Sequence, residues 1–107
     1  MKVKAIFHIY ECKINNGCTF LNGRLLHDLS MTDELILLKK IGIQYYNQNY
    51  ESDGILNIND VDYEMIKINK IISYGKSWNF LPSGMSAQIE CDCEIEGTGD
   101  LLLCKIV

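Results

Sequence analysis

The chain has 107 residues, which is enough for one domain with one hydrophobic core. Apolar residues make up 48% of it and charged residues 22%, a composition that excludes a disordered chain. The net charge is −4 and the ten basic residues are scattered, which excludes a general coat for nucleic acid, and no apolar run has the length of a membrane span. Because no signal-peptide pattern follows Met1, we expect a cytoplasmic protein.

The opening of the chain predicts a β-hairpin. Alternating residues predict a strand from Val3 to Ile14, with Val3, Ala5, Phe7 and Ile9 on one face. Asn15-Asn16-Gly17 is a turn signal, because Asn and Gly adopt positive φ at little cost. A second strand is expected from Cys18 to Leu26.

The next segment has two interpretations. Leu35 to Lys39 is a short apolar run that predicts a third strand. The alternative is a helix from Met31 to Lys40, because its start is acidic and Leu35 and Leu38 have helical spacing.

An inserted β-hairpin is expected at about residues 41–62. Ile41 to Asn47 and Ile55 to Ile58 are strand candidates on either side of the turn Glu51-Ser52-Asp53-Gly54. Tyr45 and Tyr46 of this insert suit a protein–protein contact, because tyrosine offers apolar area and a polar tip.

Three further strands complete the expected set. Ile66 to Tyr74 predicts one, ended by Gly75 and followed by a loop. Met85 to Ile95 has the clearest alternation, with Cys91 and Cys93 on the inward face. Leu101 to Val107 predicts a terminal strand, so the whole pattern indicates an all-β barrel or sandwich.

The order of the turns is also similar to that of a known domain. Gly17 is followed six residues later by Gly23-Arg24, Pro82-Ser83-Gly84-Met85 leads into the long strand, and Gly99-Asp100 leads into the last one. This order resembles the second domain of elongation factor Tu and related translational GTPases. Asp28 and Thr32 depart from the family, since they stand where it often has glycine. The resemblance implies a small closed Greek-key-like barrel, here a single domain over 1–107 with the inserted hairpin.

The resemblance also implies partners. The family's second domain contacts the ribosome, and in elongation factor Tu it helps to hold the aminoacyl end of tRNA. The sequence has no Gly-x-x-x-x-Gly-Lys-Ser/Thr loop, so the GTPase activity is not expected. We therefore expect a non-catalytic binding module for a protein partner or a component of the translation apparatus. The alternative is a self-assembling structural protein or a protein inhibitor that uses the inserted hairpin and the loop aromatics, and a homo-oligomer fits either.

Besides Tyr45 and Tyr46, five residues are candidates for binding. Arg24 is the only arginine, and its planar fork suits a carboxylate or phosphate, although a surface ion pair is the commoner role. The expected loop presents four others: Tyr74, Lys76, Trp78 and Phe80. Loop aromatics beside a lysine are common on recognition surfaces, and they can equally cap one end of a barrel.

The cysteines do not predict a metal or catalytic site. The five are Cys12, Cys18, Cys91, Cys93 and Cys104, an odd number for a disulfide scaffold. Cys91-x-Cys93 is closer than the usual spacing of zinc ligands and falls mid-strand. We expect free thiols that pack as small hydrophobic residues, with no metal, cofactor or catalytic residue.

Overall fold

A computed structural model describes residues 2–39, 54–58, 63–95 and 101–107. These residues form β-strands and contain no α-helix, which confirms the all-β prediction. The strands are β1 (Lys2–Asn15), β2 (Cys18–Leu25), β3 (Leu29–Ser30), β4 (Leu35–Lys39), β5 (Ile55–Asn57), β6 (Tyr63–Ile66), β7 (Ile68–Ser73), β8 (Lys76–Trp78), β9 (Phe80–Leu81), β10 (Ser86–Cys91) and β11 (Leu101–Ile106).

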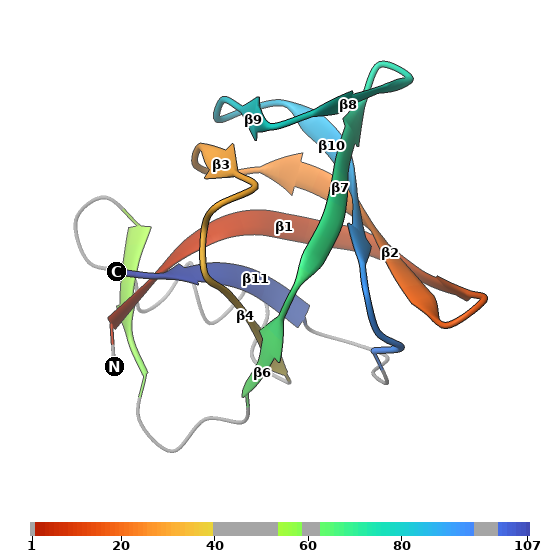
Figure 1. The fold of residues 1–107 in the computed structure, drawn as a ribbon. Helices are drawn as coiled ribbons and strands as arrows, with labels where there is room; N and C mark the ends of the chain where they lie inside the picture. The colour runs from red at the N-terminus through yellow and green to blue at the C-terminus, as the bar shows by residue number, and fades with distance from the viewer. Residues whose placement is uncertain (1, 40–53, 59–62, 96–100) are drawn as a thin grey trace.

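One strongly curved antiparallel sheet makes up most of the molecule (Figure 1). Its strands follow the order β6-β4-β11-β1-β2-β10-β7-β8, and β5 pairs with β1 beside this path. The short strands β3 and β9 form a separate two-stranded pair. Among the described residues no hydrogen-bonded sheet closes on itself. Two strands near opposite ends of this order, β6 and β7, are nevertheless consecutive in the chain, with only Lys67 between them. The first pairs with β4 and the second with β10.

The sheet has a hydrophobic core on each side of β1, β4 and β11. The larger core includes Phe7, Leu21 and Ile89, and the smaller one includes Val3, Ala5 and Leu56. The prediction that Val3, Ala5 and Phe7 share a face is wrong, because the β1–β11 register shifts between Ala5 and Phe7. A β-bulge of this kind turns the following side chains to the other face of the sheet.

Burial on both faces explains the apolar run of β4. Leu35 and Leu37 lie in the larger core, whereas Ile36 and Leu38 lie in the smaller one. A strand covered on both sides has a nearly continuous run of apolar residues. The helical alternative for this segment is wrong, and Asp33 instead closes the preceding turn by accepting a hydrogen bond from the Ser30 N–H at 2.9 Å.

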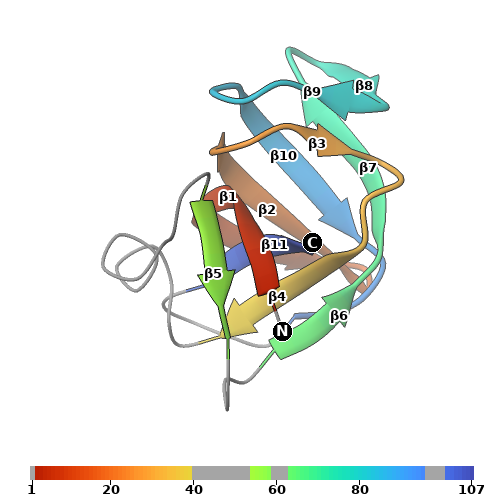
Figure 2. The ribbon, with the colours of Figure 1, turned by 90° about the vertical axis from the view of Figure 1, so that its left-hand side faces the viewer.

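The inserted region is described only in part. The strand predicted at Ile55 to Ile58 is present as β5, and its partner is β1, in which Lys4 lies opposite Ile55. Figure 2 shows β5 beside β1. The strand predicted at Ile41 to Asn47, together with Tyr45 and Tyr46, lies outside the described residues.

Two predicted strands differ in length from the observed ones. The strand expected from Ile66 to Tyr74 is divided between β6 and β7 at Lys67, whose carbonyl accepts a hydrogen bond from the Asp92 N–H at 3.1 Å. The strand expected from Met85 to Ile95 ends at Cys91. The chain turns there because the Thr19 hydroxyl binds the backbone of both Cys93 and Ile95, at 2.7 and 2.8 Å.

Candidate binding surface

The face of β1, β2, β10 and β7 that points away from the larger core carries two rows of side chains. In the first row His8 lies opposite Arg24, and Arg24 lies opposite Ser86. In the second row Gln88 lies opposite both Asn22 and Ile72. Their neighbours along the strands are buried in the core, and successive side chains of a strand point to opposite faces. Both rows therefore face outward.

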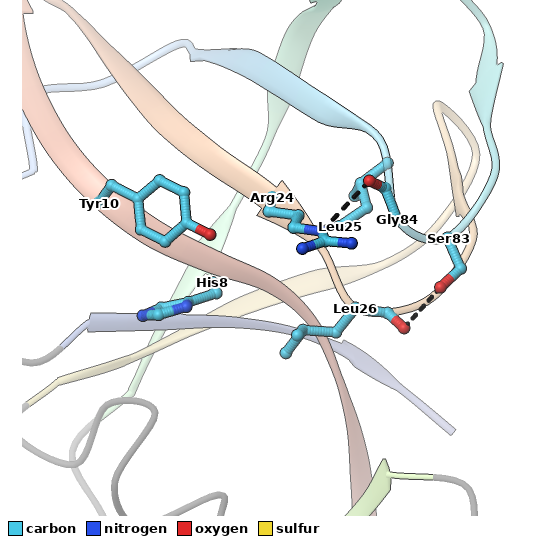
Figure 3. A pocket seen from close by; sticks show the side chains of 7 residues that line it. All are labelled: His8, Tyr10, Arg24, Leu25, Leu26, Ser83 and Gly84. Carbon is cyan, nitrogen blue, oxygen red and sulfur yellow. Dashed lines mark hydrogen bonds between the residues drawn. The ribbon is translucent and has the colours of Figure 1, made fainter.

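A surface hollow of about 330 Å³ lies over the first row. His8, Tyr10, Arg24, Leu26, Ser83 and Gly84 line it, as Figure 3 shows. The Arg24 Nε donates a hydrogen bond to the Gly84 carbonyl at 3.2 Å. Gly84 is held in turn by its own N–H, which donates to the Leu25 carbonyl at 2.8 Å. The guanidinium is thus fixed at one nitrogen, and its two terminal amino groups have no partner within the described ranges.

The rim of this hollow is held by hydrogen bonds of Ser83. Its hydroxyl donates to the Leu26 carbonyl and its N–H donates to an oxygen of Asp28, both at 2.8 Å. Asp28 stands where the resembled family often has glycine, and here it serves the turn. The residues described as lining the hollow include no carboxylate and no lysine, and Arg24 is the one arginine among them.

Tyr10 joins this hollow to a second one. Its ring meets the His8 ring edge-on, with the centroids 4.7 Å apart, and its side chain is 63% exposed. The β1–β2 register shifts between Ile9 and Glu11, so Tyr10 is the extra residue of a second bulge. Bulges often re-aim a side chain beside a functional site.

The second hollow, of about 390 Å³, lies over the second row. Tyr10 and Tyr74 both line it, and Ile72 contributes apolar surface. The Gln88 Nε2 donates to the Asn22 Oδ1 at 3.0 Å, so the two side chains form an amide pair in this hollow. No residue described as lining this hollow is charged. We call the two hollows together, from Arg24 through Tyr10 to Tyr74, the tyrosine groove.

Tyr74 has an unusual backbone conformation. It forms the two-residue turn between β7 and β8 with Gly75, and the φ angles of the two residues are 52° and 71°. Two positive φ angles are typical of a type I′ hairpin turn, in which Asn-Gly is the preferred pair. A bulky residue in this conformation is strained. The Tyr74 side chain is 83% exposed, so burial in the core does not offset that strain.

The groove contains two of the residues predicted from the sequence, Arg24 and Tyr74. The predicted loop after Gly75 is wrong in part, because Lys76 and Trp78 belong to β8, which the tight turn folds back on β7. Trp78 lies opposite the buried Ile71 and therefore on the other face of the hairpin, where its Nε1 donates to the Ser73 carbonyl at 2.9 Å. Phe80 is exposed in β9 and lines neither hollow.

Sequence reasoning missed His8, Tyr10, Asn22 and Gln88. These residues share a face through the pairing of the β1–β2 hairpin with β10, which is distant from it in the sequence. The one available signal was Gly23. A Cβ at this position would lie 1.9 Å from the His8 carbonyl oxygen, so glycine there marks the close passage of β1 over β2.

The cysteines lie apart from the groove. All those in the described residues are free, and burial raises the pKa of Cys91 and of Cys104 to about 12. Burial also raises the pKa of Cys12 and Cys93. Since the thiolate is the reactive and metal-binding form, these environments favour inert thiols. Within the described ranges no three His, Cys, Asp or Glu side chains are placed to hold a metal ion.

The described residues contain no helix with the length and apolar character that a membrane span requires. Compared with known proteins, the chain matches no protein-family model, no curated protein and no solved structure.

Proposed function

We propose that the protein is a non-catalytic binding module, and that a segment of a protein partner binds along the tyrosine groove. The groove offers two exposed aromatic rings, a hydrogen-bonded amide pair and one cation on a rigid antiparallel sheet. Few, well-placed polar groups among apolar surface are typical of recognition sites. Tyrosine in particular gives large contact area at a low cost in conformational entropy.

The observation that carries this proposal is the strained, exposed Tyr74. Strained backbone persists where the surrounding structure imposes it, and it is concentrated at functional sites. Here the strain places an aromatic ring beside the groove instead of the asparagine that the turn prefers. A role in binding accounts for a residue that the fold alone disfavours.

We also propose that the domain is a closed barrel of the type found in the second domain of elongation factor Tu. The continuity of β6 and β7 supports closure, because one nearly unbroken segment pairs with β4 through its first part and with β10 through its second. Three glycines support the resemblance in where the strands turn or bend: Gly17 in a turn, Gly23 at the close approach of β1 and β2, and Gly84 before β10.

The partner is proposed to be a protein, within or outside the translation apparatus. A nucleic-acid strand would be expected to need several cations along its backbone, whereas the described lining of the groove has Arg24 as its only lysine or arginine. Exposed tyrosines and amides suit a peptide backbone and its apolar side chains.

The proposal is tested by selecting binders from a display library of random 12-residue peptides and measuring their affinity by fluorescence anisotropy. Selected peptides are expected to lose most of their affinity for Tyr74→Asn, a variant that keeps the turn and removes the ring. The matched control is Tyr63→Asn, since Tyr63 is a half-exposed tyrosine of β6 that lines neither hollow.

Equal binding by the wild type and Tyr74→Asn, or selection of no peptide at all, would overturn the proposal. Concentration-dependent assembly in light scattering that Tyr74→Asn abolishes would also overturn it, because the groove would then serve self-association.

A further inference from the structure

We infer that the bound segment carries an acidic side chain that docks on Arg24, with an apolar or aromatic residue seated between Tyr10 and Tyr74. This inference rests on the proposed function and names the chemistry of the partner: an extended peptide segment with one carboxylate at a defined distance from one large apolar side chain.

The first support is the way Arg24 is held. Its Nε is bound to the Gly84 carbonyl at 3.2 Å, and Gly84 is itself bound to Leu25. The two terminal amino groups remain for a ligand, and their planar fork matches the two oxygens of a carboxylate. Because the guanidinium is already oriented, less rotamer entropy is lost on binding.

The second support is the local charge. The protein as a whole has 14 acidic and ten basic residues, so a polyanionic partner would be repelled. The described lining of the tyrosine groove nevertheless contains one arginine and no carboxylate. A single acidic group, placed among otherwise neutral residues, complements this arrangement.

The available hydrogen-bond donors distinguish among anions. Phosphorylated segments are typically bound by clusters of arginines, whereas this hollow has one. A C-terminal carboxylate is typically bound by free backbone N–H groups, and here the N–H groups of Ser83 and Gly84 already donate to Asp28 and Leu25. The remaining donors favour the carboxylate of an Asp or Glu side chain.

The sheet geometry also sets the spacing. Arg24 lies on β2 and Ile72 on β7, with β10 between them. Ile72 also lies in the second row, two residues along the strands from the row of Arg24. The two strand steps and this offset together span about 12 Å, and an extended peptide rises about 3.3 Å per residue. The acidic residue and the apolar residue are therefore expected about three or four positions apart in the segment.

The probes are fluorescein-labelled peptides with the pattern Glu-Ala-Ala-Trp between glycine-serine flanks, together with versions in which Gln or phosphoserine replaces Glu. Further versions vary the spacing from one to five residues. Affinity is measured by anisotropy for the wild type, Arg24→Gln, Arg24→Lys and Lys67→Gln. Lys67 is the matched control, because it is exposed, lies outside both hollows and gives the same change in net charge.

On the wild type and on Lys67→Gln, replacing Glu by Gln in the peptide is expected to weaken binding about tenfold, the size typical of a hydrogen bond to a charged group. On Arg24→Gln the same replacement is expected to have almost no effect. Arg24→Lys should show an intermediate loss, since lysine keeps the charge without the fork. The change from Glu to Gln is made in the peptide, so its effect does not depend on how well a protein variant folds.

Equal affinity of the Glu and Gln peptides for the wild type would overturn the inference. Tighter binding of the phosphoserine peptide would also overturn it, in favour of a phosphate site. If peptides still require Tyr74 but not Arg24, the inference fails and the proposed function stands. If they require neither residue, the proposed function fails as well.

Discussion

The two hairpins β1–β2 and β7–β8 use the same kind of turn with different residues. In the first, Asn16 and Gly17 have φ angles of 52° and 81°, and in the second Tyr74 and Gly75 have φ angles of 52° and 71°. Asn-Gly is the preferred pair for such a turn, whereas tyrosine is disfavoured in its first position. The first turn is suited to folding, and the second carries a ring that the fold does not require.

The hairpins also differ in how they are attached to the core. In the first, the buried Thr19 hydroxyl binds two backbone groups, those of Cys93 and Ile95. In the second, the buried Ser73 hydroxyl binds one, the Ser86 carbonyl, at 2.8 Å. The comparison indicates that β1–β2 is built for stability and that β7–β8 gives up some stability to present Tyr74.

Alkaline pH is expected to give the largest effect, through two buried thiols, one of which, Cys91, lies at the base of the first hairpin. Cys91 lies opposite Thr19, whereas β7 and β8 contain no cysteine. Burial holds the pKa of Cys91 and Cys104 at about 12 in the folded protein, while unfolded thiols ionise near 9. The stability that the two protonated thiols contribute is therefore fully present below about pH 9 and is lost as the pH rises towards 12. Each thiol contributes about 1 kcal/mol per pH unit, so unfolding should become about 4 kcal/mol easier between pH 9 and 11.

Urea unfolding at several pH values measures this loss. Cys91→Val is expected to lower the slope above pH 9 by about half, because Cys91 and Cys104 are the two thiols whose pKa is raised to about 12. A slope that is unchanged in this variant would contradict the assignment to Cys91.

Gly23→Ala is expected to destabilise the first hairpin more than any change in its turn. The new Cβ would lie 1.9 Å from the His8 carbonyl oxygen, so the backbones of β1 and β2 must separate. Overpacking of this kind costs about 3 kcal/mol. Urea unfolding measures the loss, and Ser77→Ala, an exposed change in β8, serves as the control with an effect within about 0.5 kcal/mol. A stable Gly23→Ala variant would show that the crossing is looser than described.

Thr19→Val and Ser73→Ala compare the two attachments directly. Thr19→Val leaves a buried donor, the Ile95 N–H, and a partly buried acceptor, the Cys93 carbonyl, without their partner and is expected to cost about 2 kcal/mol, whereas Ser73→Ala should cost about 1 kcal/mol. Hydrogen exchange should show faster opening of residues near Cys93 in the first variant and of β7–β8 in the second. Equal losses would contradict the proposed difference between the hairpins.

Exchanging the turn residues gives the smallest expected effect and the most specific one. Tyr74→Asn should stabilise the protein by about 1 kcal/mol, and Asn16→Tyr should destabilise it by a similar amount, because each change alters strain at one positive φ angle. Thermal unfolding measures both, with shifts of about 4–8 °C expected for a domain of this size. A loss of stability in Tyr74→Asn would mean that the tyrosine ring supports the fold.

Local patterns were sufficient to predict most of the strands. Alternation predicted much of β1 and β10, and the Asn15-Asn16-Gly17 turn signal predicted the first hairpin and with it β2, because these signals depend on neighbouring residues. The bulges near Ile6 and Tyr10 could not be predicted, since they arise where β1 meets β11 and β2. The division at Lys67 is likewise a product of pairing with two different strands.

The candidate site was predicted less well than the fold. Arg24 stood out as the single arginine and Tyr74 as an aromatic residue beside glycine. Gln88, Asn22 and His8 look like ordinary polar residues of a strand, and only the register brings them together. The loop predicted around Trp78 failed because its turn contains Tyr-Gly, a pair that sequence preferences do not associate with a tight hairpin.

The pairing of β1 with β11 has a consequence for biosynthesis. Val3 lies opposite Ile106, so β1 borders a strand that is translated about 100 residues later. The β1–β2 hairpin can form early, but both cores remain incomplete until β11 is available to cover Phe7 and Ala5. Contacts this distant in sequence slow folding, so the nascent chain exposes apolar surface for longer than a protein built from local contacts. A stable β1–β2 hairpin shortens this exposure, because β1, one of the two strands with which β11 pairs, is already in place.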